Sequence, residues 1–104
     1  MQISIISWNV NGIRAVHKKA LFSPFIDEQD PDILLLQETK AMEHQSEVDL
    51  PQYEEYWNSA ERKGYSGTAI FTKEKPLSVT NGIPEKIAAR YGLTDDAYGD
   101  PTKE

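Results

Sequence analysis

The chain has 104 residues, a net charge of −6, 38% hydrophobic residues and no cysteine. This length allows one domain or part of one, and the composition is typical of a globular protein rather than a disordered one. The lack of cysteine excludes disulfides and thiolate metal sites and predicts a reducing, cytoplasmic location. No apolar run has the length of a membrane helix, and the N-terminus lacks the pattern of a signal peptide. The acidic balance counts against a nucleic-acid partner, because phosphate contacts call for Lys and Arg, although a bound metal would add local positive charge.

Two short apolar runs, residues 3–8 and 33–36, each predict a strand buried on both faces. The first run ends in Asn9-Val10-Asn11-Gly12, where Asn-Gly is a turn signal, and the second ends in Gln37-Glu38-Thr39-Lys40. Between the runs, residues 15–29 have the apolar spacing of a helix. Pro24 predicts a kink in this helix, or else a restart with Ser23 as the N-cap.

The second half of the chain predicts strands that follow one another without a long helix. Residues 41–52 form a polar loop with one helical turn, and the expected strands, separated by a glycine-rich hairpin at 61–67, are residues 53–60, 68–72 and 77–79. Strand, helix, strand and then adjacent strands indicate a mixed α/β sheet rather than a doubly wound parallel one.

The last part of the chain differs in character from the rest. Residues 84–104 predict an irregular acidic connection, with one or two helical turns over 86–91, whereas residues 1–83 form the structured unit. No predicted strand or helix closes the chain.

The ends of the two apolar runs predict a metal site. Open α/β folds place ligands where strands stop, so we expect Asn9 and Glu38 to meet there. Carboxylate and carboxamide oxygens suit Mg²⁺ or Mn²⁺, and a desolvated carboxylate at position 38 would need a cation or hydrogen bonds. Alternatively, Glu38 is a solvent-exposed residue of a loop or forms an ion pair with Lys40. Asn11 can be explained by the turn alone, because asparagine tolerates a positive φ.

Basic residues gather at two places. Arg14, His17, Lys18 and Lys19 begin at the presumed helix start, where backbone amides and Arg14 could hold a phosphate; Lys18 and Lys19 are better explained as a solvated helix face. A second basic loop contains an aromatic residue, which suits a nucleic-acid backbone but is also common at soluble hairpin tips, and comprises Arg62, Lys63 and Tyr65. His44 is expected to be an exposed histidine.

Three ordered segments resemble the exonuclease III family of apurinic/apyrimidinic endonucleases. These are Ser7 to Ala15 (SWNVNGIRA), Pro31 to Lys40 (PDILLLQETK) and Gly64 to Lys73 (GYSGTAIFTK). The wider superfamily of metal-dependent phosphoesterases shares the Gln-Glu pair, whereas the string from Trp8 to Ala15 is similar to the DNA-repair branch. The resemblance covers roughly residues 1–83.

This resemblance implies a two-sheet α/β sandwich with one Mg²⁺-dependent phosphodiesterase site. The implied catalytic and metal-binding residues are Glu38, as the ligand, and Asn9, beside it; Asn11 stands where the family often has Asp. Arg14, Lys40 and Tyr65 match positions that approach the DNA backbone. The implied substrates are double-stranded DNA with abasic sites or 3′ ends, cleaved 5′ to the abasic site or by 3′→5′ exonuclease action, with no membrane partner.

The family's catalytic tyrosine, Asp-x-Asn site and closing Asp-His pair have no counterpart in these residues. We therefore expect this chain to be the N-terminal half of such an enzyme, inactive alone, with the C-terminal half of the same enzyme as its partner and an exposed apolar sheet face. Two alternatives stay open: a phosphoesterase of another branch acting on lipid, nucleotide or inositol phosphate, which the acidic balance favours, and a truncated non-catalytic binding fragment.

Overall fold

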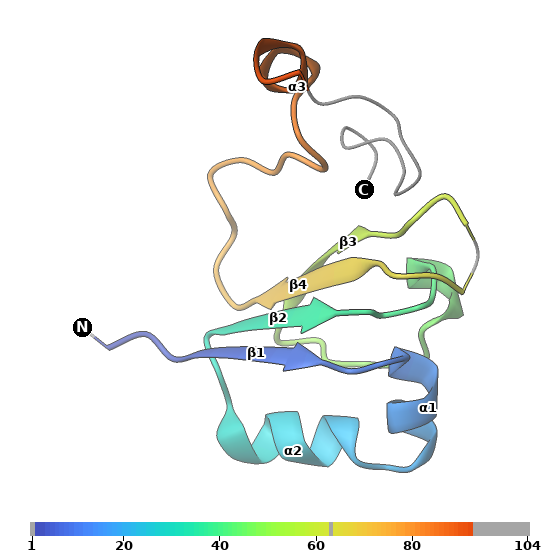
Figure 1. The fold of residues 1–104 in the computed structure, drawn as a ribbon. Coiled ribbons are helices and arrows are strands. Elements are labelled where there is room, and N and C mark those ends of the chain that lie inside the picture. Colours follow the sequence, from blue (N-terminus) through green and yellow to red (C-terminus); the bar gives the residue numbers. More distant parts are fainter. Residues whose placement is uncertain (1, 63, 93–104) are drawn as a thin grey trace.

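Four strands form one mixed sheet in the order β1-β2-β4-β3. The computed structural model describes residues 2–62 and 64–92. Along the chain (Figure 1) the elements are β1 (Ile5–Asn9), α1 (Ile13–Lys18), α2 (Phe22–Gln29), β2 (Ile33–Gln37), the 3₁₀ turn η1 (Glu43–Gln45), β3 (Glu54–Asn58), β4 (Thr68–Thr72) and α3 (Glu85–Arg90). β1 and β2 run parallel, whereas β4 pairs antiparallel with both β2 and β3, so the predicted mixed α/β architecture is confirmed.

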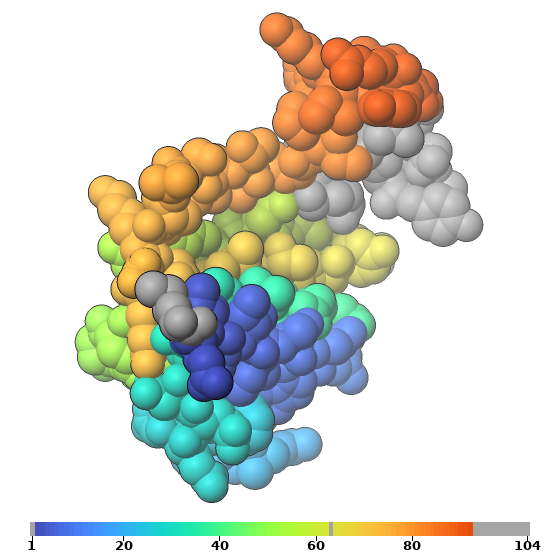
Figure 2. Space-filling view, turned by 90° about the vertical axis from the view of Figure 1, so that its left-hand side faces the viewer, coloured from blue at the N-terminus to red at the C-terminus, as the bar shows by residue number. Residues whose placement is uncertain are grey.

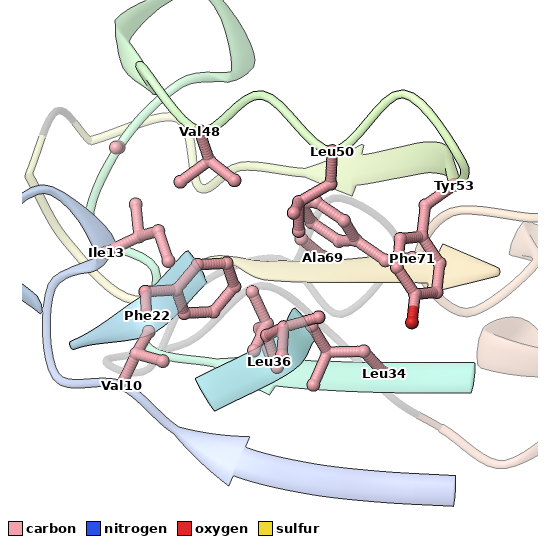
Figure 3. Packing of buried hydrophobic residues seen from close by; sticks show 12 residues of the cluster. Val10, Ile13, Phe22, Leu34, Leu36, Val48, Leu50, Tyr53, Ala69 and Phe71 are labelled. Carbon is pink, nitrogen blue, oxygen red and sulfur yellow. The ribbon is translucent and has the colours of Figure 1, made fainter. Parts of the chain in front are cut away.

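One face of the sheet carries the core. Alternate residues of β2 and β4 on this face are buried: Leu34, Leu36, Ala69 and Phe71. Helix α2 covers them with Phe22 and Ile26, and Val48 and Leu50 point into the same cluster from the 46–52 segment (Figure 3). The period-2 alternation of β4 therefore fixes which of its residues face the helices.

Aromatic rings concentrate around Phe71. The Phe71 ring lies 6.1 to 6.3 Å from the rings of Phe22, Tyr53 and Trp57. Tyr53 is itself buried, and its hydroxyl donates a 2.5 Å hydrogen bond to the Pro31 carbonyl oxygen, which ties the start of β3 to the loop before β2. This ring cluster holds α2 and the outer strand β3 to the centre of the sheet.

The helical stretch expected over residues 15–29 is two helices with a break between them, so the kink at Pro24 is wrong and the restart lies earlier than Ser23. The chain turns at Ala20, whose φ is +56°, before α2 begins at Phe22. Pro24 lies in the first turn of α2 rather than at a kink, and Ser23 is not the N-cap. The first turn tolerates proline because its backbone N–H groups have no acceptor within the helix.

Two further expectations have different outcomes. The helical turns expected in 41–52 and in 86–91 are present as η1 and α3. The expected strand at 77–79 is wrong: these residues adopt no strand, and the Leu77 side chain is fully exposed. The acidic stretch from residue 93 onward lies outside the described residues. Figure 2 shows α3 standing away from the sheet at the end of the 73–84 segment.

In the part of the chain that the structure describes, no helix covers the second face of the sheet. In register across the strands it carries Ser7, Leu35, Ile70 and Tyr56, and the Ile70 side chain is 43% exposed. The 76–81 segment borders a groove over this face. Within the described part of the chain, no helix is long and apolar enough to cross a bilayer.

Candidate active site

The parallel pairing of β1 with β2 places the ends of both strands at one edge of the sheet. The arrowheads of both strands point to the right-hand side of Figure 1. Asn9, the last residue of β1, lies opposite Gln37, the last residue of β2. The Asn9 side-chain amide donates a hydrogen bond to Oε2 of Glu38, although 29 residues separate the two. Asn9 Oδ1 accepts a 3.1 Å hydrogen bond from the Asn11 backbone amide, so the turn orients the amide group towards the carboxylate.

The environment of Glu38 differs from the expectation. Its side chain is 45% exposed, so the prediction of a desolvated carboxylate that requires a cation is wrong. Glu38 directly follows β2 and has a φ of +52°, which ends the strand and leaves the carboxylate at the rim, within reach of water. The carboxylate is therefore open to an incoming cation rather than dependent on one.

Lys40 joins this pair from the same segment. Its Nζ lies 3.9 Å from Glu38 Oε1 and donates a 2.5 Å hydrogen bond to Asn11 Oδ1. Asn11 has a φ of +46°, which agrees with its expected role in the turn. The Arg14 guanidinium in turn donates a 3.1 Å hydrogen bond to the Lys40 carbonyl oxygen. The structure thus brings together Asn9, Asn11, Arg14, Glu38 and Lys40 at one edge.

The start of α1 offers less to a phosphate than the sequence suggested. The backbone amides of Gly12 and Ile13 donate to the carbonyl oxygens of Glu38 and Thr39, at 2.8 and 2.9 Å. These two donors are occupied by the protein itself. A phosphate near this point would therefore be held mainly by side chains.

A cleft shares Arg14 and Lys40 with this group of residues, whereas Asn9 and Glu38 do not line it. Its polar and charged lining residues are Arg14, His17, Lys18, Lys40, Gln45 and Glu47. Four of these six side chains are basic residue types, which gives a locally cationic cleft on a chain of net charge −6. His44, on η1, is exposed as expected.

The second basic loop is only partly joined to this cleft. Gly64 lines the cleft, whereas the Tyr65 side chain is 50% exposed and its ring lies under the Arg62 guanidinium, with 5.6 Å between Cζ and the ring centroid. Lys63 lies outside the described residues. Tyr65 therefore follows a cleft residue in the chain without lining the cleft itself, and it is half exposed.

The sequence alone did not reveal that two further polar residues, Asn58 and Thr68, lie in the same row across the sheet as Asn9 and Gln37. Across the four strands, Asn9 and Gln37 continue in register into Thr68 and Asn58. Strand register is needed to see this row, because Asn58 and Thr68 lie on strands that pair antiparallel. Gln37 uses its side-chain amide to bind Ser7 Oγ at 3.0 Å, and so fixes the open face rather than the carboxylate.

The donor set fits a weakly enclosed Mg²⁺ rather than a protein-caged metal. In residues 2–62 and 64–92, no group of three His, Cys, Asp or Glu side chains is arranged to hold a metal ion. Mg²⁺ commonly keeps several water ligands and binds through one or two carboxylates together with substrate phosphates. The half-exposed Glu38 carboxylate, near a cleft with a largely basic lining, meets that requirement.

A family model described as "Endonuclease/Exonuclease/phosphatase family" matches residues 6–104. The chain belongs to this family. It is 51% identical over 81 residues to the exodeoxyribonuclease of Bacillus subtilis, which covers 78% of this chain and 32% of that protein. It is 42% identical over 84 residues to a DNA-(apurinic or apyrimidinic site) endonuclease of Dictyostelium discoideum, covering 79% of this chain and 23% of that protein.

A solved structure shares both the fold and part of the sequence. The 3′ phosphatase from Neisseria bound to a product DNA hairpin superposes with a TM-score of 0.63 and 27% identity, over 80% of this chain and 32% of that one. These findings confirm the resemblance to exonuclease III-type enzymes. The chain spans about a third or less of the length of these relatives.

Proposed function

We propose that this chain supplies the metal-binding N-terminal half of a DNA-repair phosphodiesterase. The parent activity would be that of an apurinic/apyrimidinic endonuclease and 3′→5′ exodeoxyribonuclease. The observation that carries the proposal is the Asn9–Glu38 hydrogen bond at the strand ends, in a chain whose relatives carry nuclease names. A carboxylate held by a neutral amide keeps its negative charge and free lone pairs for a cation.

In this proposal Glu38 is the protein ligand of Mg²⁺, with Mn²⁺ as an alternative, and Asn9 contributes by orienting it. Asn9 is suited to that role because its Nδ2 faces the carboxylate while its Oδ1 is engaged by the Asn11 amide. Asn9 as a direct ligand is the alternative, and it would require the amide to turn over. A bound Mg²⁺ would polarise a phosphate oxygen.

The cleft residues would hold the DNA backbone. Arg14 offers a planar pair of donors to a phosphate, and Lys40 a single compact charge, both on the cleft wall. Tyr65 would add an aromatic face from the loop that follows Gly64, as expected from the resemblance. The substrate class is double-stranded DNA with abasic sites or 3′ ends.

We propose that the chain alone binds metal and DNA but does not incise. Hydrolysis needs a base for the attacking water and a group that stabilises the leaving oxygen, in addition to a metal. At the strand ends the described residues supply the Glu38 carboxylate, which a bound metal would occupy. The remaining groups would come from the C-terminal half of the same enzyme, covering the open sheet face, and a cytoplasmic location remains a prediction.

A chimera tests this function directly. The segment aligned over 81 residues would replace its counterpart in the Bacillus subtilis exodeoxyribonuclease, and abasic-site incision with Mg²⁺ would be measured. We expect the chimera to incise DNA at the abasic site. Its Glu38→Gln variant should lose most of that activity while its circular dichroism spectrum, which reports folding, stays unchanged. A folded chimera without activity would contradict the proposal.

The isolated chain distinguishes the alternatives. DNA-repair function predicts tighter binding to an abasic-site duplex than to the intact duplex, and no incision of either. Equal, weak binding to both duplexes would favour a phosphoesterase of another branch or a non-catalytic fragment. Robust incision by the isolated chain would overturn its proposed inactivity.

A further inference from the structure

The segment that carries Glu38 has an unusual backbone. Glu38 and Lys40 both have a φ of +52°, with the fully buried Thr39 between them. Residues other than glycine seldom adopt this left-handed conformation, and they keep it only where the surroundings impose it. Because the side-chain direction of Glu38 depends on this turn, whatever imposes the turn also positions the carboxylate.

Backbone hydrogen bonds hold the segment on both sides. On one side it accepts from the amides of Gly12 and Ile13. On the other, the Thr39 amide donates to the Gly67 carbonyl oxygen at 3.2 Å, and the Lys40 amide donates to the Ser66 carbonyl oxygen at 2.8 Å. The turn after β2 is thus clamped between the turn after β1 and the loop before β4.

Gly67 leaves no room for a side chain next to Thr39 in this clamp. A Cβ atom at Gly67 would lie 2.6 Å from Thr39 Oγ1, a separation that forces one of the two to move. Gly67 also has a φ of +91°, so glycine is required both by conformation and by space. Thr39 Oγ1 is buried and has no hydrogen-bond partner among the residues that the structure describes. A buried hydroxyl without a partner costs free energy, so the side chain is favoured here for its shape.

We propose that Thr39 and Gly67 are positioning residues for the Glu38 carboxylate: the close fit of the branched Thr39 side chain against the bare Gly67 backbone imposes the turn that aims Glu38 at Asn9. This inference rests on the proposed function for its metal-binding consequence. It stands without that function for its geometric consequence, which is the Asn9–Glu38 hydrogen bond.

The test reads both consequences in the 104-residue chain. The Asn9 side-chain amide resonance, in a ¹⁵N-labelled sample, reports the hydrogen bond to Glu38, and Mn²⁺ titration followed by electron paramagnetic resonance reports the metal site. We expect Gly67→Ala to shift the amide signal towards that of a free asparagine and to weaken Mn²⁺ binding about tenfold, the usual effect of losing a residue that orients a ligand.

Three variants separate positioning from general damage. Gly92→Ala is the matched control, because Gly92, just after α3, also has a positive φ, +69°, but open space where its Cβ would lie. It should leave both readouts unchanged. Thr39→Val keeps the branched shape and removes the unpaired hydroxyl, so it too should keep both. Thr39→Ala removes the branched shape and should shift both readouts in the same direction as Gly67→Ala.

The outcomes are distinguishable. Parent-like readouts in a folded Gly67→Ala variant, or a loss in Thr39→Val equal to that in Gly67→Ala, would overturn the positioning role. Should Gly67→Ala not fold, Thr39→Ala alone is the second variant, and an unchanged amide signal in it would overturn the inference. A parent chain that binds no Mn²⁺ would contradict the proposed function and leave the amide readout to decide the positioning role.

Discussion

The side-chain amide of Asn9 donates to the carboxylate of Glu38, and this contact exists because β1 and β2 pair in parallel with Asn9 opposite Gln37. Neither residue would reach the other through local structure, since 29 positions separate them. The pairing register brings the two strand ends together, and the turn after β2 then places Glu38 within reach of Asn9. The site is therefore as stable as the sheet that supports it.

Removing the orienting amide should weaken the metal site. We expect Asn9→Ala to lower Mn²⁺ affinity about tenfold, because the Glu38 carboxylate loses the donor that aims it. Asn58→Ala is the matched control: Asn58 lies in the same polar row but on β3, two strands away from Gln37. Equal losses in both variants, measured by electron paramagnetic resonance, would argue against a specific role for Asn9.

Phosphate contacts by Arg14 and Lys40 should appear in the salt dependence of DNA binding. For each of Arg14→Gln and Lys40→Gln, the slope of log K against log salt should fall by about 0.9, the contribution of one phosphate contact. Fluorescence anisotropy with an abasic duplex measures this slope. Lys86→Gln, on the exposed outer helix α3, is the control and should leave it unchanged. Unaltered slopes in all three variants would show that the cleft does not contact the DNA backbone.

Stability should fall at alkaline pH through Tyr53. Burial raises the pKa of Tyr53 above its usual 10.0, an effect that the nearby Lys73 charge partly opposes. A raised folded-state pKa stabilises the protein below the unfolded-state value, and this stabilisation is lost as pH rises through the folded-state pKa. The free energy of unfolding of the parent should therefore decline above about pH 10.

The Tyr53→Phe variant isolates the contribution of Tyr53 ionisation to the pH dependence of stability. Near pH 7 the variant should be less stable by about 1 kcal/mol, because it lacks the hydrogen bond to the Pro31 carbonyl. The pKa of Lys73 is raised by its hydrogen bond to Asp30, so its stabilising contribution is also lost as pH rises. This loss occurs in both proteins and cancels in the difference between them. Urea unfolding from pH 7 to pH 11 should thus show the difference shrinking. A constant difference over that range would contradict the assignment.

The core should depend on Phe71 far more than on its neighbour. Phe71 is fully buried among three aromatic rings, so Phe71→Ala should cost about 3–5 kcal/mol, a large fraction of the stability of a small domain. Ile70→Ala, one residue earlier on the open face and 43% exposed, should cost clearly less. Thermal unfolding of the two variants checks this, and similar losses would mean that the open face is covered in solution.

Much of the fold could be predicted because its elements follow strong local patterns. A short run of Thr, Ile and Phe after the glycine-rich 61–67 segment predicts the strand Thr68–Thr72, and the structure has the strand at the same residues. The helix break at Ala20 was missed because no Gly or Pro marks it; a positive φ at alanine depends on tertiary packing. The strand expected at 77–79 failed because β propensity needs a partner edge, and the exposed Leu77 has none within the described sheet.

For the site, residue types at strand ends were enough to pair Asn9 with Glu38. Their environment was not predictable, because the exposure of Glu38 depends on a left-handed turn that the sequence does not display. The row from Asn9 to Asn58 required the strand register, and the Thr39–Gly67 fit required the atomic packing. Local pattern thus indicated the chemistry, while tertiary contacts set its geometry.

Magnesium titration calorimetry on the Glu38→Gln variant tests the central claim most directly. Glu28→Gln is the matched control, since Glu28 lies near the end of α2, which leads to the opposite end of β2 from Glu38. The account predicts that Glu38→Gln weakens Mg²⁺ binding by at least about tenfold, because the substitution removes the one charged ligand, and that Glu28→Gln binds like the parent. Parent-like affinity in Glu38→Gln would contradict the account.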